Sequence, residues 1–522
     1  MADEPLLGPL SSVCGGAGLG TRPDVPCTPP EDVHRRLRGL GRVRAVVVGS
    51  ALATADADGS ALPPELHCVV TAAQRARGAA RLLAGQRGGA LVCVVLVRDD
   101  ATSPDRIVCE ALSGFVRSAA AELSHYGVSV QGVIVGAGHA RQADRADGPP
   151  PVSTAARLVR MLTARPDPAP TGQVYLVTGR ELSRVAAPTV DRGLLRTDRR
   201  PSAAQVTDAL GRGFGRAGDT QPPQEQGAAG GMAGRVAIVT GGGGGIGRAV
   251  ATGLAAEGAA VVVADLGCDP DGRGRNPSLA EDTAHAITRR GGRAVAVCAD
   301  VSRPDECSDL VARAVGAFGR IDALCHAAGV VRQALVHEAT DEDWDAVLGV
   351  HVAGTGHLVE ACLGPMLSHG HGRIVLFSSR SVAGSPGLST YSTAKGAVLA
   401  FGRSLAAQVA GSGVCVNVVL PSGRTRASLP DAPSARRRRI ELLRARHHRI
   451  ADPVAYRNSP EQDPENNVAV IGWLCGDQAG AVNGQVFGTG GWQVDLYRPG
   501  AVARSLPLPR RLTPEDLRVL SA

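Results

Sequence analysis

Lysine is almost missing from this chain. Among 56 lysine and arginine residues, Lys395 is the single lysine and every other one is arginine. A position that keeps lysine against such a bias predicts a need for an ammonium group, because lysine is a compact charge with a tunable pKa, whereas guanidinium is a wide planar fork that stays protonated. Lys395 is therefore the first candidate functional residue.

Other scarcities exclude whole classes of protein. Aromatic residues make up 3% of the chain, and its 12 cysteines are scattered without a CxxC pair, which favours buried thiols in a reducing compartment over disulfides or a metal site. No apolar run approaches the length of a membrane span, and the N-terminal residues lack the layout of a signal peptide. The formal charge of +7 allows an acidic partner but does not indicate nucleic acid. We expect a cytoplasmic globular protein with neither a membrane nor a nucleic acid as partner.

The composition of successive segments predicts five regions. Residues 1–35 are rich in glycine and proline without periodicity, as in a disordered leader, and residues 36–196 alternate strand-like and helix-like patterns. Residues 197–233 are polar and rich in glycine and proline, which is typical of a linker. A second α/β region spans residues 234–500, and residues 501–522 form a tail.

The two α/β regions resemble copies of one another. FVRSAAAELSHYGVSVQ at 115–131 aligns without a gap with FGRSLAAQVAGSGVCVN at 401–417, and GQVY at 172–175 is matched by GQVF at 484–487. The longer spacing in the second copy indicates an insertion at about 426–451. The fold class predicted is α/β, with tandem Rossmann-like doubly wound parallel sheets.

The first copy lacks the candidate functional residues of the second copy. At the positions that correspond to Tyr391 and Lys395 it has Asp105 and Cys109, and no glycine-rich turn follows its first strand. We therefore expect the first copy to be degenerate and to have a structural role.

The pentapeptide Tyr391-Ser-Thr-Ala-Lys395 places its two end residues on one face of a helix, one turn apart. An ammonium group there favours the phenolate and lowers the pKa of Tyr391 toward working pH, as a general acid–base requires. The alternative is a chance tyrosine–lysine pair on a solvated helix.

A glycine-rich turn links a strand to a helix at the start of the second copy. The strand at 235–239 runs into Thr240-Gly-Gly-Gly-Gly-Gly-Ile-Gly247, and an alanine-rich helix follows. Glycines allow a tight turn and the close approach of backbone to a pyrophosphate, which then lies at the positive end of the helix. The sequence therefore predicts a dinucleotide site.

Asp265 ends the next strand, Ala260-Val-Val-Val-Ala264, where an acidic residue meets the adenosine ribose hydroxyls in such sites. A carboxylate there would repel a 2′-phosphate, so we expect NAD(H) rather than NADP(H). Arg273 and Arg275 in the following loop leave NADP(H) open as the less favoured cofactor, and a simple turn or cap residue is the other interpretation of Asp265.

Together these motifs resemble those of the short-chain dehydrogenase/reductase family over about residues 234–491. TGGGGGIG is similar to the family's TGxxxGIG, Asp300-Val301 to its adenine-contacting pair, and YSTAK to its YxxxK. The resemblance implies a cofactor site formed by Gly241, Gly245, Ile246, Gly247, Asp265, Asp300, Val301, Ala328, Gly329, Tyr391, Lys395, Pro421 and Thr425, with no metal.

Three positions depart from the family pattern. His326-Ala-Ala-Gly329 replaces NNAG, which loses two asparagines that brace the central strand. His351 stands where the family has a catalytic asparagine, and it is either a water-holding relay to Lys395 or a packed histidine. The catalytic serine is Ser379 if counted along the strand, or Ser378 if counted back from the tyrosine; we take Ser379 because strand ends are better fixed than loops.

The resemblance implies hydride transfer between a nicotinamide and a carbonyl carbon, with Tyr391 delivering the proton, Ser379 binding the oxygen, and Lys395 holding the nicotinamide ribose. The duplicated architecture resembles high-molecular-weight 3-oxoacyl-acyl-carrier-protein reductases, and the loop after Asp265 resembles the hydroxyacyl-CoA dehydrogenase branch of multifunctional enzymes. We expect reduction of a 3-oxoacyl thioester in fatty acid or polyketide metabolism. The alternatives are a 3-hydroxyacyl-CoA or other secondary-alcohol dehydrogenase and a non-catalytic dinucleotide-binding scaffold.

Two expectations concern partners. The insertion carries Arg436-Arg-Arg-Arg439, Arg444, Arg446 and Arg449, and such a cationic lid would attract the phosphates of an acyl thioester or an acidic acyl carrier protein. The alternative is a solvated helix in an arginine-rich chain. Because members of the family commonly assemble as tetramers, a chain with two copies is expected to form a homodimer that mimics one.

Overall fold

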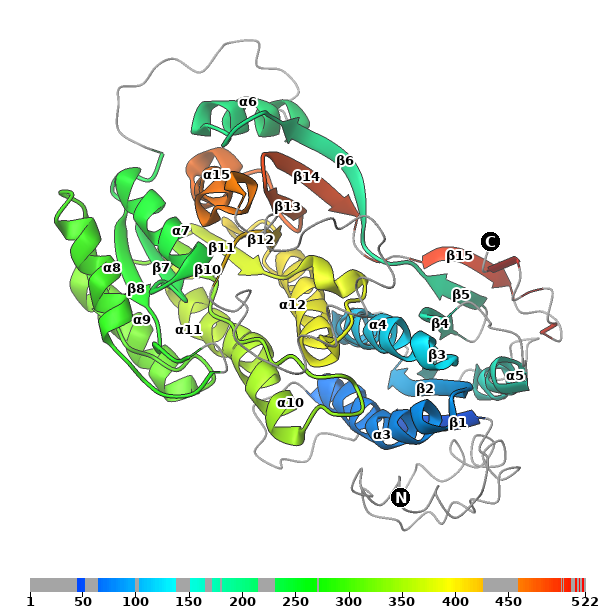
Figure 1. The fold of residues 1–522 in the computed structure, drawn as a ribbon. Coiled ribbons are helices and arrows are strands. Elements are labelled where there is room, and N and C mark those ends of the chain that lie inside the picture. Colours follow the sequence, from blue (N-terminus) through cyan, green and yellow to red (C-terminus); the bar gives the residue numbers. More distant parts are fainter. Residues whose placement is uncertain are drawn as a thin grey trace.

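The computed structural model describes residues 45–51, 64–98, 103–137, 151–164, 171–178, 181–214, 231–269, 272–425, 459–498, 500, 502–507 and parts of 512–520. The expected leader at 1–35 and the arginine-rich lid lie outside these residues. The described chain forms two sheets with helices packed around them (Figure 1).

The second half of the chain builds a 9-stranded sheet in the order β6-β14-β13-β12-β11-β10-β7-β8-β9. Its buried strands are almost entirely Val, Ala, Ile and Leu, as expected for strands covered on both faces. The strands from β13 to β9 are parallel, and β14 and β6 add antiparallel at one edge. Their bounds are β7 Val236–Thr240, β8 Ala260–Ala264, β9 Arg293–Val297, β10 Ala323–His326, β11 Gly372–Phe377, β12 Val414–Pro421, β13 Val486–Gly490, β14 Gln493–Arg498 and β6 Thr189–Arg196.

Helices follow the parallel strands in the expected alternation. Those of the second half are α7 Gly245–Ala256, α8 Ser278–Thr288, α9 Pro304–Phe318, α10 Asp341–Leu348, the π-helical turn η4 Gly349–Ala353, α11 Gly354–Ser368, α12 Ser389–Gln408 and α15 Val468–Cys475. Short 3-10 turns occur at η5 Arg380–Ala383, η7 Pro460–Gln462, η8 Pro464–Asn467 and η9 Asp477–Ala479.

The first half builds a smaller sheet, in the order β1-β2-β3-β4-β5-β15. Its strands are β1 Ala45–Ala51, β2 Gly89–Arg98, β3 Val128–Ala137, β4 Gln173–Val177, β5 Glu181–Val185 and β15 Val502–Pro507. The helices are α3 Pro64–Gln86, α4 Ser103–Leu123 and α5 Pro151–Ala164, with a 3-10 turn η2 at Ser124–Tyr126. β1 to β4 are parallel, so the α/β fold class and the tandem Rossmann-like sheets predicted from the sequence are confirmed.

The two halves are joined by helix α4 packing along α12, with the two helices side by side at the centre of the molecule (Figure 1). Glycines allow the backbones to approach closely: a Cβ at Gly114 would collide with the carbonyl of Ser392, and one at Gly396 with the carbonyl of Glu110. One hydrophobic core runs across this contact, and Phe115 of the first half lies 6.1 Å from the ring of Trp344 in the second. The halves are therefore not independent units joined by a tether.

The halves also exchange their last strands, which corrects the predicted domain boundaries. β6, expected in the first domain, pairs antiparallel with β14 of the second sheet. β15, expected in a tail, pairs antiparallel with β5 of the first sheet. Helix α6 (Ala203–Phe214) lies within the expected linker, because Val206, Ala209 and Leu210 give it an apolar face that is buried against the second half. The sequence did not predict the placement of β6, β15 and α6, because edge strands and surface helices are largely solvent-facing and therefore polar in composition.

One helical stretch also departs from the expectation that no segment approaches membrane length. Residues 341–368 run as α10, η4 and α11 and are long and apolar enough, by length and composition, to cross a bilayer. Of its apolar 18-residue window, 56% is buried inside the protein, and Trp344, Leu358 and Cys362 of this stretch pack in the core. Its apolar character is explained by that packing.

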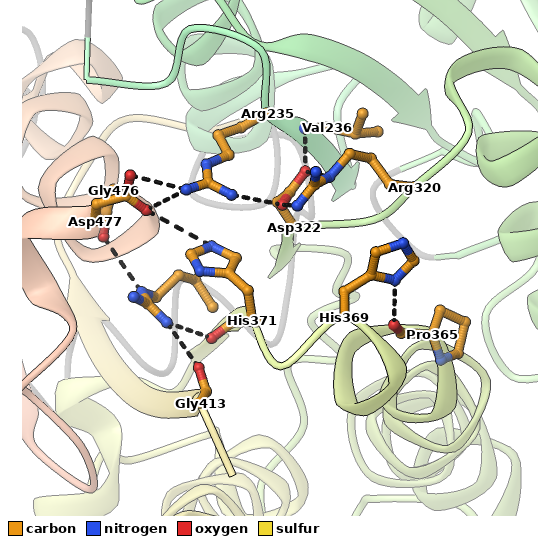
Figure 2. A network of polar contacts seen from close by, with 12 residues as sticks. Arg235, Val236, Arg320, Asp322, Pro365, His369, His371, Gly413, Gly476 and Asp477 are labelled. Carbon is orange, nitrogen blue, oxygen red and sulfur yellow. Dashed lines mark hydrogen bonds and ion pairs between the residues drawn. The ribbon is translucent and has the colours of Figure 1, made fainter. Parts of the chain in front are cut away.

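A charged network holds the amino ends of the central strands together (Figure 2). The carboxylate of Asp322, just before β10, is fully buried and accepts hydrogen bonds from the backbone of Val236, at 2.9 Å, and from the guanidinium of Arg320, at 2.6 and 2.8 Å. Arg235 bridges Asp322, at 3.1 Å, to Asp477, at 2.7 Å. This network lies at the opposite strand ends from the site described below.

Replacing the buried carboxylate should therefore lower stability without changing the site. For Asp322→Asn we expect the free energy of unfolding to fall by about 3 kcal/mol, because two guanidinium groups lose their shared buried charge. Urea unfolding of the variant would measure it. The matched control is Asp305→Asn, which breaks an exposed pair with Arg303 and should leave the free energy of unfolding almost unchanged. Equal losses in the two variants would contradict this account.

Candidate active site

The site lies where the strand order of the larger sheet reverses, between β7 and β10. A cavity of about 450 Å³ opens there, bordered by the carboxyl ends of the strands from β7 to β12. Parallel sheets of this kind bind their ligands at such a point, because the loops diverge and leave a crevice.

The glycine-rich turn forms one wall of the cavity. Gly241 has a φ of +67° and Gly245 one of +51°, conformations that residues with a side chain rarely adopt. A Cβ at Gly241 would press on the backbone of Ala327 and Ala328. Helix α7 starts at Gly245, and its cap residue Gly244 has no side chain, so the first N–H groups are open to an anion. These features fit the pyrophosphate of a dinucleotide.

Asp265 lies at the end of β8, in the wall of the cavity, and is held there by the backbone. Its Oδ2 accepts a hydrogen bond from the N–H of Gly243 at 2.8 Å, and its Oδ1 accepts one from Gly267 at 2.7 Å. The carboxylate therefore both closes the glycine loop and places negative charge on that side of the cavity.

The two arginines that follow Asp265 already have carboxylate partners. Arg273 donates to Glu342 at 3.0 Å, and Arg275 pairs with Glu306. Both guanidinium groups are thus drawn toward carboxylates on other helices. An added 2′-phosphate would have to compete with these ion pairs.

Tyr391, Lys395 and Ser379 meet beside the cavity. Tyr391 lies in the first turn of α12 and forms a hydrogen bond with the hydroxyl of Ser379. Lys395 lies one turn further on, 4% exposed, with its Nζ 5.5 Å from the tyrosine ring centroid and 2.5 Å from the carbonyl of Phe377, to which it donates. Ser378 is turned away from the tyrosine and donates to the carbonyl of Lys395 at 2.7 Å.

The expected lowering of the tyrosine pKa is wrong for this structure. Burial raises the pKa of Tyr391 to about 12, and the hydrogen bond from Ser379 opposes this only in part. Burial also lowers the pKa of Lys395 to about 7, so near neutral pH its charge is only partly present. Desolvation is the largest cause of both pKa shifts.

His351 is packed against Tyr391, with ring centroids 5.2 Å apart and planes at 81°. It lies in the π-helical turn η4, a feature frequent at functional sites. Its Nε2 donates to the carbonyl of Val330 at 2.9 Å, whereas its buried Nδ1 has no partner. Burial and the charge of Lys395 keep the pKa of His351 well below its usual value, so the ring is neutral. A relay through this histidine stays a prediction.

His326, at one of the positions where the family has asparagine, connects strands β10 and β7 through its side chain. Its Nδ1 lies 2.8 Å from Oγ1 of Thr240, which also accepts a hydrogen bond from the N–H of Ala328 at 3.3 Å. The ends of β7 and β10 are therefore tied together at the point where the strand order reverses.

The structure brings almost all of the predicted site residues to one cavity. Those that line it are Gly241, Gly245, Ile246, Gly247, Asp265, Asp300, Val301, Ala328, Gly329, His351, Tyr391, Lys395, Pro421 and Thr425. Ser379 lies just behind Tyr391, and Ser378 is in the wall. In the described part of the chain no cluster of three His, Cys, Asp or Glu side chains could hold a metal ion. What each residue does in catalysis stays a prediction.

The sequence analysis missed Glu122, which comes from the other half of the chain. It lies on α4, is 1% exposed, and its carboxylate accepts hydrogen bonds from Val336, Gly387 and Ser389 beside the cavity. The signal was a single acidic residue in the apolar run SAAAEL, within the repeated segment.

The fold and this site define a dinucleotide-binding oxidoreductase, and comparison with known proteins agrees. The family model for short chain dehydrogenases matches residues 235–429. The short-chain reductase protein NovJ of Streptomyces niveus is 43% identical over 186 residues, which are 36% of this chain and 68% of NovJ. The chain belongs to the short-chain dehydrogenase/reductase family.

Two further relatives carry names that specify a substrate. The hydroxyacyl-CoA dehydrogenase ChsB1 of Mycobacterium tuberculosis is 32% identical over 286 residues, 52% of this chain and 82% of that protein. A 3-oxoacyl-acyl-carrier-protein reductase of Synechocystis is 36% identical over 188 residues, 36% of this chain and 73% of that protein.

The burial of Lys395 predicts how stability depends on pH. Between pH 7 and 10.5 the unfolded chain holds a proton on this lysine that the folded protein has lost, so the free energy of unfolding rises with pH. Relative to Lys395→Met, the wild-type protein should gain about 2 kcal/mol between pH 7 and pH 9, since one proton changes stability by about 1.4 kcal/mol per pH unit. Urea unfolding at both pH values measures the gain, and parallel pH dependences for the two proteins would refute it.

Proposed function

We propose that this protein is an NAD(H)-dependent oxidoreductase that reduces a 3-oxoacyl thioester, carried by CoA or an acyl carrier protein, to the 3-hydroxyacyl form. The observation that carries the proposal is the meeting of Tyr391, Lys395 and Ser379 beside a cavity whose other wall suits a dinucleotide. The names of the two substrate-specific relatives supply the thioester.

The chemistry divides between cofactor and chain. A bound nicotinamide supplies the hydride for the carbonyl carbon. Tyr391 gives its proton to the carbonyl oxygen, which Ser379 orients by a hydrogen bond, and Lys395 holds the nicotinamide ribose. General acid–base help of this kind is worth roughly 10²–10⁴-fold in rate.

Reduction starts from the protonated form of Tyr391, whereas oxidation starts from its phenolate. With the pKa of Tyr391 raised to about 12, the phenol is protonated and ready to act as an acid. Oxidation of a 3-hydroxyacyl thioester needs the phenolate, which this environment disfavours. The hydroxyacyl-CoA dehydrogenase relative keeps the oxidative direction as the second candidate.

The preference for NAD(H) rests on charge. Asp265 is fixed at the ribose side of the cavity by two backbone N–H groups, and Arg273 and Arg275 are held by Glu342 and Glu306. A 2′-phosphate would meet this carboxylate, while the guanidinium groups of Arg273 and Arg275 are already paired with glutamates. The repulsion between two negative charges in a partly buried site is substantial.

The acyl carrier and the location of the protein are proposed from the arginines and cysteines of the chain. The arginines at 436–449 lie outside the described residues, so their sequence alone supports an anionic carrier. None of the nine cysteines whose side chains the structure describes is in a disulfide, which supports a reducing, cytoplasmic setting for fatty acid or polyketide metabolism.

We also propose that the chain forms a homodimer. The α4–α12 contact already joins two Rossmann-like halves, so two chains would bring together four. Light scattering of the full chain should give the mass of two chains, and a monomer at micromolar concentration would rule the proposal out.

The test of function is reduction of acetoacetyl-CoA by NADH, followed as loss of absorbance at the nicotinamide band. We expect wild-type turnover with NADH to exceed that with NADPH, and Tyr391→Phe to lose at least about 10²-fold in kcat with NADH affinity unchanged, because it removes the acid and leaves the pocket. Tight NADH binding without turnover of any 3-oxoacyl thioester would favour the non-catalytic scaffold. Faster oxidation of 3-hydroxybutyryl-CoA by NAD would favour the dehydrogenase.

A further inference from the structure

Glu122 lies at the end of α4, in the half of the chain that lacks catalytic residues, yet its carboxylate is surrounded by donors of the other half. Oε2 accepts from the N–H of Val336 at 2.6 Å, and Oε1 accepts from the N–H of Gly387 at 2.7 Å and the hydroxyl of Ser389 at 3.0 Å. Three donors converge on one buried charge, and such charge-assisted bonds are among the strongest in proteins.

Two of the donors lie in loops near the cavity, and the third is the first residue of α12. Val336 follows the segment that lines the cavity at Val330 and Val331, and Gly387 lies in the loop that leads into α12. The loops also bond to each other, since the N–H of Ala334 donates to the carbonyl of Gly387 at 3.2 Å. The carboxylate therefore joins the loop at Val336 to the start of α12.

The same carboxylate holds the start of helix α12. The helix begins at Ser389, and its cap residue Leu388 offers no side-chain hydrogen bond to the first turn. Glu122 contacts this end from across the interface, since it accepts from the hydroxyl of Ser389 and from the N–H of Gly387, which precedes the cap residue. Ser389 lies two residues before Tyr391 in the same turn.

Other hydrogen bonds and an ion pair also connect α3 and α4 to these two loops. The hydroxyl of Ser118, also on α4, accepts from the N–H of Ser385 at 3.0 Å. Arg77, on α3, donates to the carbonyl of Ala339 at 2.6 Å and pairs with Asp341 at 3.2 Å. Glu122 differs from Ser118 and Arg77 because one of its partners, Ser389, lies two residues before Tyr391 in α12.

We propose that Glu122 is a positioning residue for the reaction: it fixes the first turn of α12, and with it the hydroxyl of Tyr391, against the loop at Val336. This rests on the proposed function. The non-catalytic half thereby completes the active site of its own chain, which goes beyond a structural role. A shift of the tyrosine by about 1 Å is enough to lower turnover by about 10²-fold.

The test uses full-length variants. Glu122→Ala removes both acceptor oxygens and leaves all three donors without this partner, whereas Glu122→Gln keeps the shape and one acceptor oxygen. The glutamine variant covers the case in which the alanine variant fails to fold. The matched control is Glu110→Gln. Glu110 is on the same helix, is 5% exposed, and like Glu122 has a pKa raised by burial to about 7, but its carboxylate faces Arg117 and the backbone of Gly500.

Two readouts separate positioning from stability. With acetoacetyl-CoA and NADH, kcat should fall about 10-fold for Glu122→Gln and up to about 10²-fold for Glu122→Ala, with the dissociation constant of NADH within twofold. Glu110→Gln should keep kcat within about twofold at a similar loss of thermal stability. Equal effects of Glu122→Gln and Glu110→Gln on kcat would overturn the proposal.

Hydrogen exchange tests the contact without any substrate. The amides of Val336 and Gly387 should lose protection in Glu122→Gln and keep it in Glu110→Gln. If the wild-type protein fails to reduce the thioester, the proposed function fails while this arm still decides whether Glu122 holds the loops. Unchanged protection of both amides in Glu122→Gln would contradict the proposal that Glu122 holds these loops.

Discussion

The packing of α4 against α12 is the contact on which the rest of the molecule depends. Gly114 and Gly396 let the helix backbones come so close that no side chain fits between them, and one hydrophobic core continues through the contact. As a result α12 is buried on almost every side. Without the first half of the chain this face of α12 would be uncovered, so the first half acts as a dry cover for the catalytic helix.

That burial sets the chemistry of the site. Burial raises the pKa of the phenol to about 12 and lowers that of the ammonium group to about 7, so near neutral pH Tyr391 is neutral and Lys395 is only partly charged. A lysine tolerates this by giving up its proton, whereas a guanidinium would stay charged in an apolar surrounding. The survival of one lysine in an arginine-rich chain is therefore consistent with a position where charge has to be adjustable.

The sequence predicts the parts of the site that depend on local chemistry. The glycine turn, Asp265 and the pair Tyr391 and Lys395 each carry their signal within a few neighbouring residues, and the structure brings them to one cavity. The direction of the tyrosine pKa could not be predicted, because it depends on how deeply α4 buries α12. The roles of Glu122 and of the exchanged strands could not be predicted either, because their partners lie hundreds of residues away in the sequence and no local pattern indicates such a contact.

The exchange of β6 and β15 has a consequence for the order in which the protein can be made. A ribosome releases the whole first half long before it reaches residue 502, so the smaller sheet has to wait with the edge of β5 unpaired until nearly the last residues emerge. Unpaired edges of this kind readily pair with other chains. Helix α4 also lacks its packing partner during this time, because α12 is synthesised only after more than half of the chain. The nascent chain therefore has a long interval in which a chaperone, or a second ribosome's product, can compete for the same edge.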